Sequence, residues 1–234
     1  MTTSFVFFHV GQDVAIPEML VSSIRWSNPD ATVIQCSDAE TPSVVGISRK
    51  SVTICDSERL MTSRLNAFAN CEVDGEAAYL DTDMIVVKKI DVKQLLGSSI
   101  IGMCRRSFQR EHIFNYYQRD IYFNEYKNLK IDDVYPYLAC FTLTQNPKIW
   151  DILHQSLLTM EEKFHRWYGD QEALKLFAYR SPADVIDLPE STYGCLPEYI
   201  DGKAGPSVIH FKGGHRKQLM KKFYLSLKVQ PLYI

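Results

Sequence analysis

The sequence predicts an α/β protein in which helices cover a mainly parallel central sheet. The first observation is an apolar segment at 4–10, a segment with helical spacing at 17–26 and a second apolar segment at 31–36. Strand, helix and strand in this order form a βαβ unit, which implies parallel strands. The second observation is a globular composition, with 46% hydrophobic and 23% charged residues. A length of 234 residues favours one large domain over two.

The elements of the first half follow from apolar spacing and from helix breakers. Asn28 and Pro29 end the first helix. The elements then expected are a strand at 52–55, a helix at 58–69, a strand at 77–80 and a strand at 99–104. The inner side of the helix at 58–69 carries the apolar residues Leu60, Met61, Leu65 and Phe68.

The second half begins with an aromatic and charged stretch at 105–137 that has little periodicity, followed by a strand at 137–143. Asn146 and Pro147 supply a helix N-cap and a proline in the first turn, and the apolar stripe after them predicts one long helix. That stripe comprises Ile149, Ile152, Leu153, Leu157, Met160 and Phe164. The last elements expected are a helix from residue 170, strands at 185–188 and 208–211, and a helix at 216–227.

Charge is distributed unevenly along the chain, although the net charge is only -2. Residues 203–234 hold seven of the 26 basic side chains and no acidic one, whereas residues 1–202 hold 19 basic and 28 acidic side chains. The acidic body argues against general nucleic-acid binding. The basic end indicates a local anionic partner, such as a diphosphate or a membrane surface.

Cysteine usage and hydropathy bear on the compartment. The six cysteines form no C-x-x-C pair, so we expect reduced, mainly buried thiols rather than a zinc knuckle or a redox motif. No apolar run reaches the roughly 18 to 20 residues that span a bilayer, and residues 1–9 lack the basic start and cleavage site of a secretory signal. We therefore expect a cytoplasmic protein that is at most peripheral to a membrane.

The most informative motif is Asp81-Thr82-Asp83, which follows an apolar strand. Carboxylates two residues apart in an extended chain point to one face, with Cα atoms about 6.5 Å apart, and can converge on a hard cation. Open α/β sheets bind ligands at this end of their strands. The alternative is a turn in which Asp81 is a cap and Asp83 is solvated. The apolar flanks weigh against it, because charge beside a buried strand needs a partner.

Two further motifs contain residues suited to a phosphorylated ligand. His210 at a strand end is followed by Gly213, Gly214 and several bases, which can supply a metal ligand, close backbone approach and cations for phosphate. Asp170 and Gln171 stand at a helix start, where they can face a substrate. The simpler interpretations are a structural histidine before a turn and an aspartate that caps its helix.

Together and in this order, these motifs resemble the GT-A glycosyltransferases, in particular the glycogenin-like and lipopolysaccharide galactosyltransferase family. The resemblance covers nearly the whole chain, from the opening βαβ unit to the late histidine, glycines and bases. It implies a GT-A (Rossmann-like, nucleotide-diphospho-sugar transferase) fold with a mixed, mainly parallel sheet in a single domain over 1–234. Residues 1–104 would form the nucleotide-binding half, 105–215 the acceptor-side half and 216–234 a basic amphipathic tail.

The resemblance implies a metal site and a donor site. Asp81, Asp83 and His210 would hold Mn²⁺ or Mg²⁺ against the diphosphate of a nucleotide sugar. Arg64, on the helix before the motif, matches the arginine that contacts the nucleotide sugar, the alternative being a solvated helix residue. The other residues expected at the donor are His9, Gly11, Thr82, Lys212, Gly213, Arg216 and Lys217.

The resemblance also implies the reaction. Asp170 and Gln171 match the pair beside the donor sugar, so the expected activity is transfer of a hexose, from a UDP-sugar and with retention, to a glycan or lipid-linked acceptor. The chain departs from the family pattern at three places. Arg216 stands where relatives have a lysine, and the Pro-Trp that follows it in relatives is absent. Residues 9–12 lack the acidic residue that many relatives carry after the first strand, and residues 137–140 replace the Asn-x-Gly strand of relatives.

The aromatic residues of the stretch at 105–137 fall where such enzymes build an acceptor cleft. Aromatic faces suit sugar rings, because they bury apolar CH groups and leave hydroxyls free to bond. The alternative for each residue is ordinary core packing. These residues are Phe108, Phe114, Tyr116, Tyr117, Tyr122, Phe123 and Tyr126.

The helix expected at 216–227 is basic and amphipathic. It would either lie on an anionic membrane or pack its apolar stripe on the protein's own sheet. Its closeness to the strand of His210 favours packing.

Other functions agree less well with the sequence. A haloacid-dehalogenase-like phosphatase carries D-x-D after its first strand, not in the middle of the chain. A sugar nucleotidyltransferase needs a Gly-rich basic loop where this chain has Val10-Gly11-Gln12-Asp13. The main alternative is a non-catalytic nucleotide-sugar or glycan-binding protein of the same fold, against which the intact Asp81, Asp83 and His210 set argues.

Overall fold

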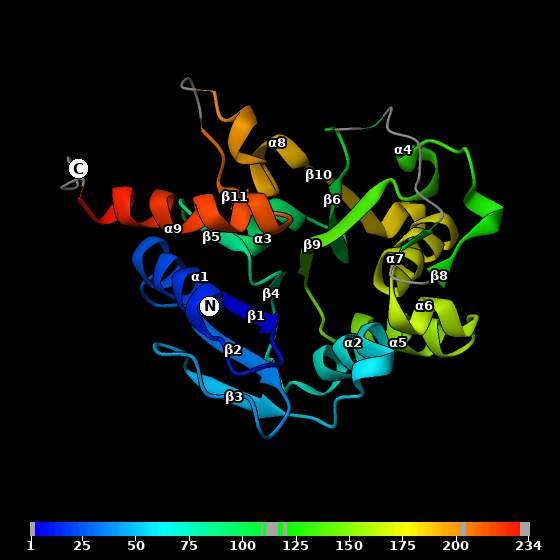
Figure 1. Cartoon of the computed structure of the whole chain (residues 1–234), viewed down its shortest axis with the longest axis horizontal. Coiled ribbons are helices and arrows are strands. Elements are labelled where there is room, and N and C mark those ends of the chain that lie inside the picture. The colour runs from blue at the N-terminus through cyan, green and yellow to red at the C-terminus, as the bar shows by residue number, and fades with distance from the viewer. Residues whose placement is uncertain (1–2, 109, 111–116, 119–120, 202–204, 230–234) are drawn as a thin grey trace.

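A seven-stranded sheet with the order β10-β6-β9-β4-β1-β2-β3 forms the centre of the computed structural model (Figure 1). The model describes residues 3–108, 110, 117–118, 121–201 and 205–229. The strands of this sheet are β1 (Ser4–Phe8), β2 (Thr32–Ser37), β3 (Arg49–Val52), β4 (Ala77–Leu80), β6 (Ile101–Arg105), β9 (Tyr137–Thr144) and β10 (Val185–Pro189).

The sheet is mixed and mainly parallel, which confirms the predicted fold class. β1 pairs in parallel with β2 and β4, β2 with β3, and β6 with β10. β9 is antiparallel to both of its neighbours, β4 and β6. Two small antiparallel sheets join β5 (Met84–Val86) to β11 (Val208–His210), and β7 (Tyr117–Gln118) to β8 (Ile121–Tyr122).

Helices cover both faces of the sheet, because alternate side chains of the central strands point to opposite faces. Phe5 and Phe7 of β1 belong to one apolar cluster with α1 (Ala15–Ser27) and α3 (Val92–Leu96). Val6 belongs to the other, with α2 (Leu60–Asn70), α5 (Ile149–Leu158), α6 (Glu162–Arg166) and α7 (Gly169–Arg180). The remaining helices are α4 (Ile131–Val134), α8 (Glu190–Tyr193) and α9 (Gly214–Val229), with single 3-10 turns at Ser57–Arg59, Asn124–Tyr126, Pro182–Asp184 and Pro197–Tyr199.

Two predicted elements are wrong in detail. The third strand covers Arg49–Val52 rather than 52–55, and polar residues occupy it because it is one of the two outermost strands of the sheet. The single long helix expected after Pro147 is two helices, α5 and α6. The chain turns between them so that α6 packs against α7, and Ile152 of the expected apolar stripe is 56% exposed.

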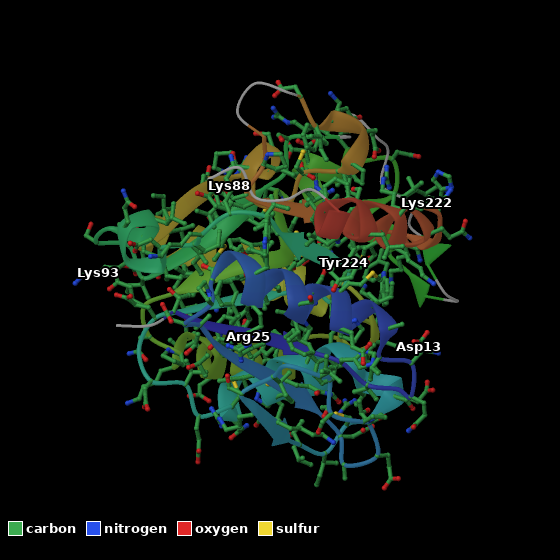
Figure 2. The ribbon with its side chains drawn as sticks, turned by 90° about the vertical axis from the view of Figure 1, so that its left-hand side faces the viewer. Asp13, Arg25, Lys88, Lys93, Lys222 and Tyr224 are labelled. Atoms are coloured by element: carbon green, nitrogen blue, oxygen red, sulfur yellow. The ribbon has the colours of Figure 1, made fainter. Side chains whose placement is uncertain are left out.

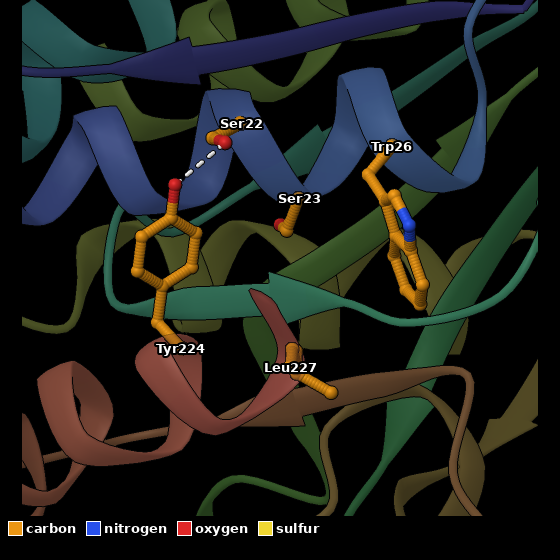
Figure 3. Close-up of a pocket in the computed structure, with 5 residues that line it drawn as sticks. All are labelled: Ser22, Ser23, Trp26, Tyr224 and Leu227. Atoms are coloured by element: carbon orange, nitrogen blue, oxygen red, sulfur yellow. Dashed lines mark hydrogen bonds between the residues drawn. The ribbon is translucent and has the colours of Figure 1, made fainter. Parts of the chain in front are cut away.

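The C-terminal helix α9 lies beside α1 (Figures 1 and 2). Met220 is fully buried and packs with Met19 of α1, and the Tyr224 hydroxyl donates a 2.7 Å hydrogen bond to Ser22 (Figure 3). A small pocket of about 110 Å³ remains between the two helices. The apolar stripe of α9 thus packs on the protein itself, as one of the two alternatives predicts. Among the described residues, no helix has the length and apolarity to cross a membrane.

Candidate metal centre and adjoining pocket

A pocket of about 550 Å³ lies where β4 ends. It is lined by residues of the β4–β5 turn, β9, α2, α7 and the segment after β11. Open α/β sheets bind ligands at the carboxyl ends of their strands, since several strand ends and helix starts meet there. All three sequence motifs contribute to the walls of this pocket, although the first and the last of them are more than 120 residues apart in the chain.

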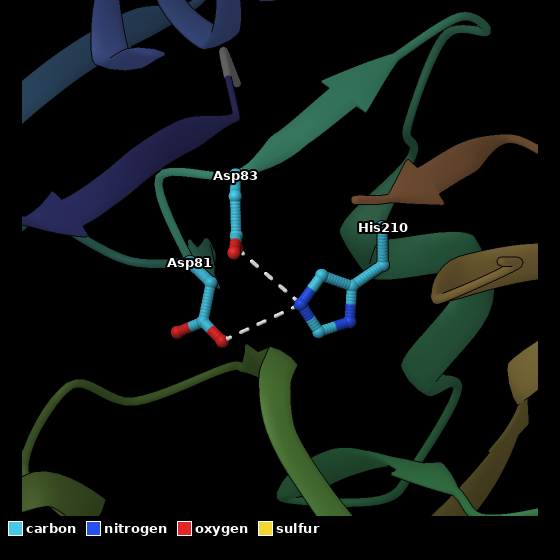
Figure 4. A group of neighbouring side chains, drawn as sticks. All are labelled: Asp81, Asp83 and His210. Carbon is cyan, nitrogen blue, oxygen red and sulfur yellow. Dashed lines mark ion pairs between the residues drawn. The ribbon is translucent and has the colours of Figure 1, made fainter. Parts of the chain in front are cut away.

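Asp81, Asp83 and His210 come together at this pocket (Figure 4). The two aspartates occupy the turn between β4 and β5, and β5 pairs with β11 so that His210 lies opposite Met84. A backbone hydrogen bond of 2.8 Å from Phe211 to the Asp83 carbonyl fixes this register. Strand pairing therefore places the imidazole beside two carboxylates that are far away in sequence.

Each carboxylate directs one oxygen toward His210, and its other oxygen pairs with a basic side chain. His210 Nε2 lies 3.3 Å from Asp83 Oδ1 and 3.9 Å from Asp81 Oδ2. The outer oxygens are held by Arg64, 2.7 Å from Asp81 Oδ1, and by Lys217, 3.4 Å from Asp83 Oδ2. One ligand atom from each of the three residues lies within 4.8 Å of the other two. Two carboxylate oxygens and an imidazole nitrogen so arranged could hold a divalent metal ion.

Burial and mutual contact shift the pKa values of this group. Burial alone would raise the pKa of Asp83, but His210 and Lys217 lower it to about 2. Burial would likewise lower the pKa of His210, whereas Cys140 and Asp83 raise it to about 10. The metal-free protein thus holds Asp83 and His210 as an ion pair. A histidine binds a metal only through its neutral imidazole, so metal binding at this group would release the extra proton of His210.

Arg64 is a buried bridge rather than a solvated helix residue. Its side chain is only 12% exposed and reaches Asp81, Asp170 at 2.9 Å and the Ala139 carbonyl at 3.0 Å. Burial raises the pKa of Asp170, and the Arg64 guanidinium opposes that effect. α2 therefore contributes a fixed positive charge between the aspartates of two different motifs.

Asp170 and Gln171 both line the pocket from the first turn of α7. Asp170 does not act as the helix N-cap, because that position belongs to Tyr168, and its carboxylate is paired with Arg64 instead. Tyr168 has a φ of 62°, a left-handed conformation that is uncommon in residues other than glycine. A Cβ atom at Gly169 would overlap the Phe164 carbonyl oxygen, so only glycine lets α7 begin this close to α6.

The basic residues after β11 separate into two groups. Lys212, Gly213 and Lys217 line the pocket, and Gly213 has a φ of 86°, as expected of a glycine that turns the chain into α9. Arg216 instead pairs with Glu198, with Nε 3.0 Å from Glu198 Oε2, and is not among the residues that line the pocket. Position along the chain could not distinguish these neighbours, because the start of α9 turns successive side chains in different directions.

The described residues that line this pocket do not include three others that were expected at the donor, namely His9, Gly11 and Thr82. Thr82 lies in the turn between the two aspartates. His9 and Gly11 follow β1, where the Gly11 amide donates a 2.9 Å hydrogen bond to Thr41. Burial lowers the pKa of His9, which favours its neutral form.

The aromatic residues expected at the acceptor side mostly pack against the protein where the structure describes them. Phe123 is fully buried, Phe108 stacks on Tyr199 at 4.2 Å, and the Tyr126 hydroxyl donates to Glu172. Phe114 and Tyr116, and the side chains of Tyr117 and Tyr122, lie outside the described residues. The aromatic residues that do line the pocket, Trp167 and Tyr168, directly precede the Asp170 motif.

Sequence reasoning also missed Arg106, Glu190 and Cys140. Arg106 follows β6 and is 4% exposed, and Glu190, at the start of α8, is equally buried. Cys140 lines the pocket from β9. Arg106 could have been recognised as a candidate from its position just after a predicted strand, because ligands bind at the carboxyl ends of such strands.

Comparison with solved structures identifies glycosyltransferases. A structure of the galactosyltransferase LgtC with donor and acceptor sugar analogues matches with a TM-score of 0.61 and 15% identity, over 98% of each chain. GlyE of Streptococcus pneumoniae TIGR4 matches with a TM-score of 0.60 and 15% identity, over 96% of this chain and 61% of GlyE. A glycosyltransferase involved in glycosylation of the major capsid of PBCV-1 matches with a TM-score of 0.59 and 12% identity, over 95% of this chain and 100% of that chain. No family model matches the chain, and no curated protein sequence matches it significantly. These likenesses confirm the GT-A glycosyltransferase fold.

Proposed function

We propose that this protein is a metal-dependent glycosyltransferase that moves a hexose from a nucleoside-diphosphate sugar to a glycan or lipid-linked acceptor. The observation that carries the proposal is the convergence of Asp81, Asp83 and His210 on one point. The point lies in the pocket at the carboxyl end of β4, in a fold shared with glycosyltransferases.

The residues of the metal centre have distinct tasks in this proposal. Asp81, Asp83 and His210 would hold Mn²⁺ or Mg²⁺, which would supply Lewis-acid stabilisation of the charge on the departing nucleoside diphosphate. Arg64 and Lys217 already hold the outer carboxylate oxygens, so the inner oxygens are preorganised. Such preorganisation lowers the cost of reorganisation during the reaction.

The donor would lie along the wall formed by α7 and the start of α9. Lys212 and Lys217 would donate charge-assisted hydrogen bonds to phosphate oxygens, and Gly213 would allow the backbone to approach them. Arg216 would take part only after leaving Glu198. Thr82, His9 and Gly11 would lie toward the nucleoside, because they follow β4 and β1 at the same sheet edge.

Asp170 and Gln171 would face the donor sugar. The Asp170 carboxylate, held by Arg64, would accept hydrogen bonds from sugar hydroxyls, and Gln171 would lie beside the reacting carbon. A structure of an LgtC variant whose active-site glutamine is replaced by glutamate has a TM-score of 0.58 to this chain, which supports a role for a glutamine in this fold. We propose a UDP-sugar donor and retention of configuration.

The first test is the thermal unfolding midpoint with UDP, GDP, CMP and AMP, each with and without Mn²⁺. A ligand at 100 times its dissociation constant adds about 2.7 kcal/mol of stability, which raises the midpoint by roughly 5–10 °C in a chain of this size. We expect a metal-dependent shift with one nucleotide, which is absent in Asp83→Ala. The exposed Asp74 offers a matched control, and Asp74→Ala should keep the shift.

The second test is turnover of the sugar donors of that nucleotide, with and without sugar acceptors. Release of the free nucleoside diphosphate by the wild type, lost in Asp81→Ala and Asp83→Ala, is the expected result. Binding without any turnover would favour the non-catalytic binding protein. No shift with any nucleotide and metal would contradict the donor site itself.

A further inference from the structure

Arg106 is a buried arginine fixed from two sides. Its backbone amide donates to the Pro136 carbonyl at 2.8 Å, and its Nε donates to the Tyr135 carbonyl at 2.9 Å. With the side chain anchored in this way, the Nη2 atom reaches Gln171 Oε1 at 3.4 Å. Only 4% of Arg106 is exposed, so water competes little for this contact.

The loop after Arg106 is held by a second buried group. Glu190 Oε2 accepts hydrogen bonds from the backbone amides of Ser107 at 2.5 Å and Phe108 at 2.7 Å. Burial lowers the pKa of Arg106, and the charge of Glu190 opposes this effect. A guanidinium remains protonated over the whole physiological range in any case. Arg106 is therefore a fixed, charged donor behind the wall that carries Gln171.

The chemistry of the two side chains decides which end of the Gln171 amide faces Arg106. A guanidinium has five N–H donors and no acceptor, so only the carbonyl oxygen of the amide can bond to it. The nitrogen of the same amide is then turned away from Arg106, and Gln171 lines the pocket. The positive charge also polarises the amide and strengthens its N–H groups as donors.

We propose that Arg106 is a positioning residue that holds the Gln171 carbonyl oxygen and presents the Gln171 amide nitrogen to the donor sugar. The inference rests on the proposed function and adds the orientation of one of its residues. Gln171 then acts beside the reacting carbon as a hydrogen-bond donor to sugar oxygens. The guanidinium draws electron density from the amide oxygen, which makes that oxygen a weaker nucleophile and leaves the N–H groups as the acting part of the side chain.

A double-mutant cycle tests the positioning. Arg106→Met removes a hydrogen bond to a charged group, which is worth about 1.5–3 kcal/mol, so kcat should fall roughly 10- to 150-fold while KM for the donor changes little. In the Gln171→Ala background, Arg106→Met should have almost no further effect on kcat. Arg105→Met is the matched control, because it removes the same charge from the neighbouring position. Arg105 lies over the Tyr137 ring. The Arg105→Met variant should leave kcat unchanged.

Gln171→Glu tests the orientation directly. Glutamate keeps an oxygen for Arg106 but lacks the N–H groups, so we expect it to lose about as much kcat as Gln171→Ala. Activity of Gln171→Glu at or above the wild-type level would overturn the inference, because the oxygen would then be the acting atom. Equal effects of Arg106→Met in both backgrounds would also overturn it.

Two controls separate the possible failures. If Arg106→Met does not fold, Arg106→Lys replaces it in the cycle, and the Gln171→Glu result is independent of both. A wild type that turns over none of the donors contradicts the proposed function itself. A wild type that is active, with an uncoupled cycle, contradicts the positioning role alone.

Discussion

At the scale of single residues, the candidate site is a network of fixed opposite charges. Arg64 touches the carboxylates of Asp81 and Asp170, while Lys217 and His210 touch that of Asp83. Desolvated charges are tolerated in proteins only when they are paired in this way. Removal of one partner leaves another charge buried without compensation, so these residues depend on one another for stability as well as for binding.

The Asp83 and His210 pair should make the stability of the metal-free protein depend on pH. The pKa of Asp83 is lowered from 3.8 to about 2, so its contribution is present above pH 3.8 and is lost as pH falls toward 2. The pKa of His210 is raised from 6.5 to about 10, so its contribution is present below pH 6.5 and is lost as pH rises through 10. The pair therefore stabilises the metal-free protein most between pH 3.8 and pH 6.5, where both contributions are present.

Urea unfolding in the presence of a chelator, at pH 5.5 and pH 9, measures this dependence. The difference in unfolding free energy between the wild type and Asp83→Asn should shrink as pH rises from 5.5 to 9, because the unfolded chain loses its His210 proton above pH 6.5 whereas the folded wild type keeps it until about pH 10. A difference that stays constant over this range would contradict the ion pair.

At the scale of elements, the start of α7 depends on the absence of a side chain. A Cβ atom at Gly169 would overlap the Phe164 carbonyl oxygen and lie 2.6 Å from Leu157 Cδ1. The same turn carries Asp170 and Gln171 into the pocket. Gly169 therefore matters both for the packing of α7 against α6 and for the placement of Asp170 and Gln171 in the pocket.

Gly169→Ala should cost about 1–3 kcal/mol of stability through overpacking. It should also weaken donor turnover, because α7 must move away from α6 and carry its two polar residues with it. Gly214, the first residue of α9, has nothing within 4 Å of its Cβ position, so Gly214→Ala should change stability by less than about 0.5 kcal/mol. Urea unfolding of both variants measures the contrast, and equal stabilities would contradict it.

The docking of α9 on α1 provides a second prediction at this scale. Met220 is fully buried, so Met220→Ala should cost about 2–5 kcal/mol and lower the thermal midpoint by several degrees. Lys221 is exposed, and Lys221→Ala should lie within about 0.5 kcal/mol of the wild type. Comparable midpoints for the two variants would show that α9 does not pack on α1 in solution.

At the scale of the whole molecule, one strand joins the two halves of the chain. β9, from residues 137–144, lies between β4 and β6 and pairs with both. Residues 1–104 contain β4 and most of β6 but lack the strand between them. Neither half can therefore complete the sheet without the other.

We predict a single cooperative unfolding transition, with coincident midpoints from circular dichroism and tryptophan fluorescence. A fragment of residues 1–104 should remain unfolded when expressed alone, because its sheet has unpaired edges on both sides of the missing strand. Two separate transitions, or a folded fragment, would contradict the shared sheet. The intact chain serves as the control under the same conditions.

Local patterns were enough for the elements with strong apolar signals. The strand at Ala77–Leu80 is fully buried and was predicted with its observed bounds. The strand at Arg49–Val52 was misplaced because an outermost strand needs few apolar residues. The break between α5 and α6 was missed because the apolar spacing continues through Met160 and Phe164 while the chain turns.

Apolar periodicity and residue types were sufficient to predict the α/β class, the D-x-D turn at the end of a buried strand, and the three motifs that line the pocket. Which neighbouring side chains share that pocket became clear only from the packing of the folded chain. This packing turned Lys217 toward Asp83 and Arg216 toward Glu198, and it brought Arg106 to Gln171 across 65 positions. The reason is physical: periodicity records which face of an element is buried, whereas the partner of a polar side chain depends on how separate elements pack.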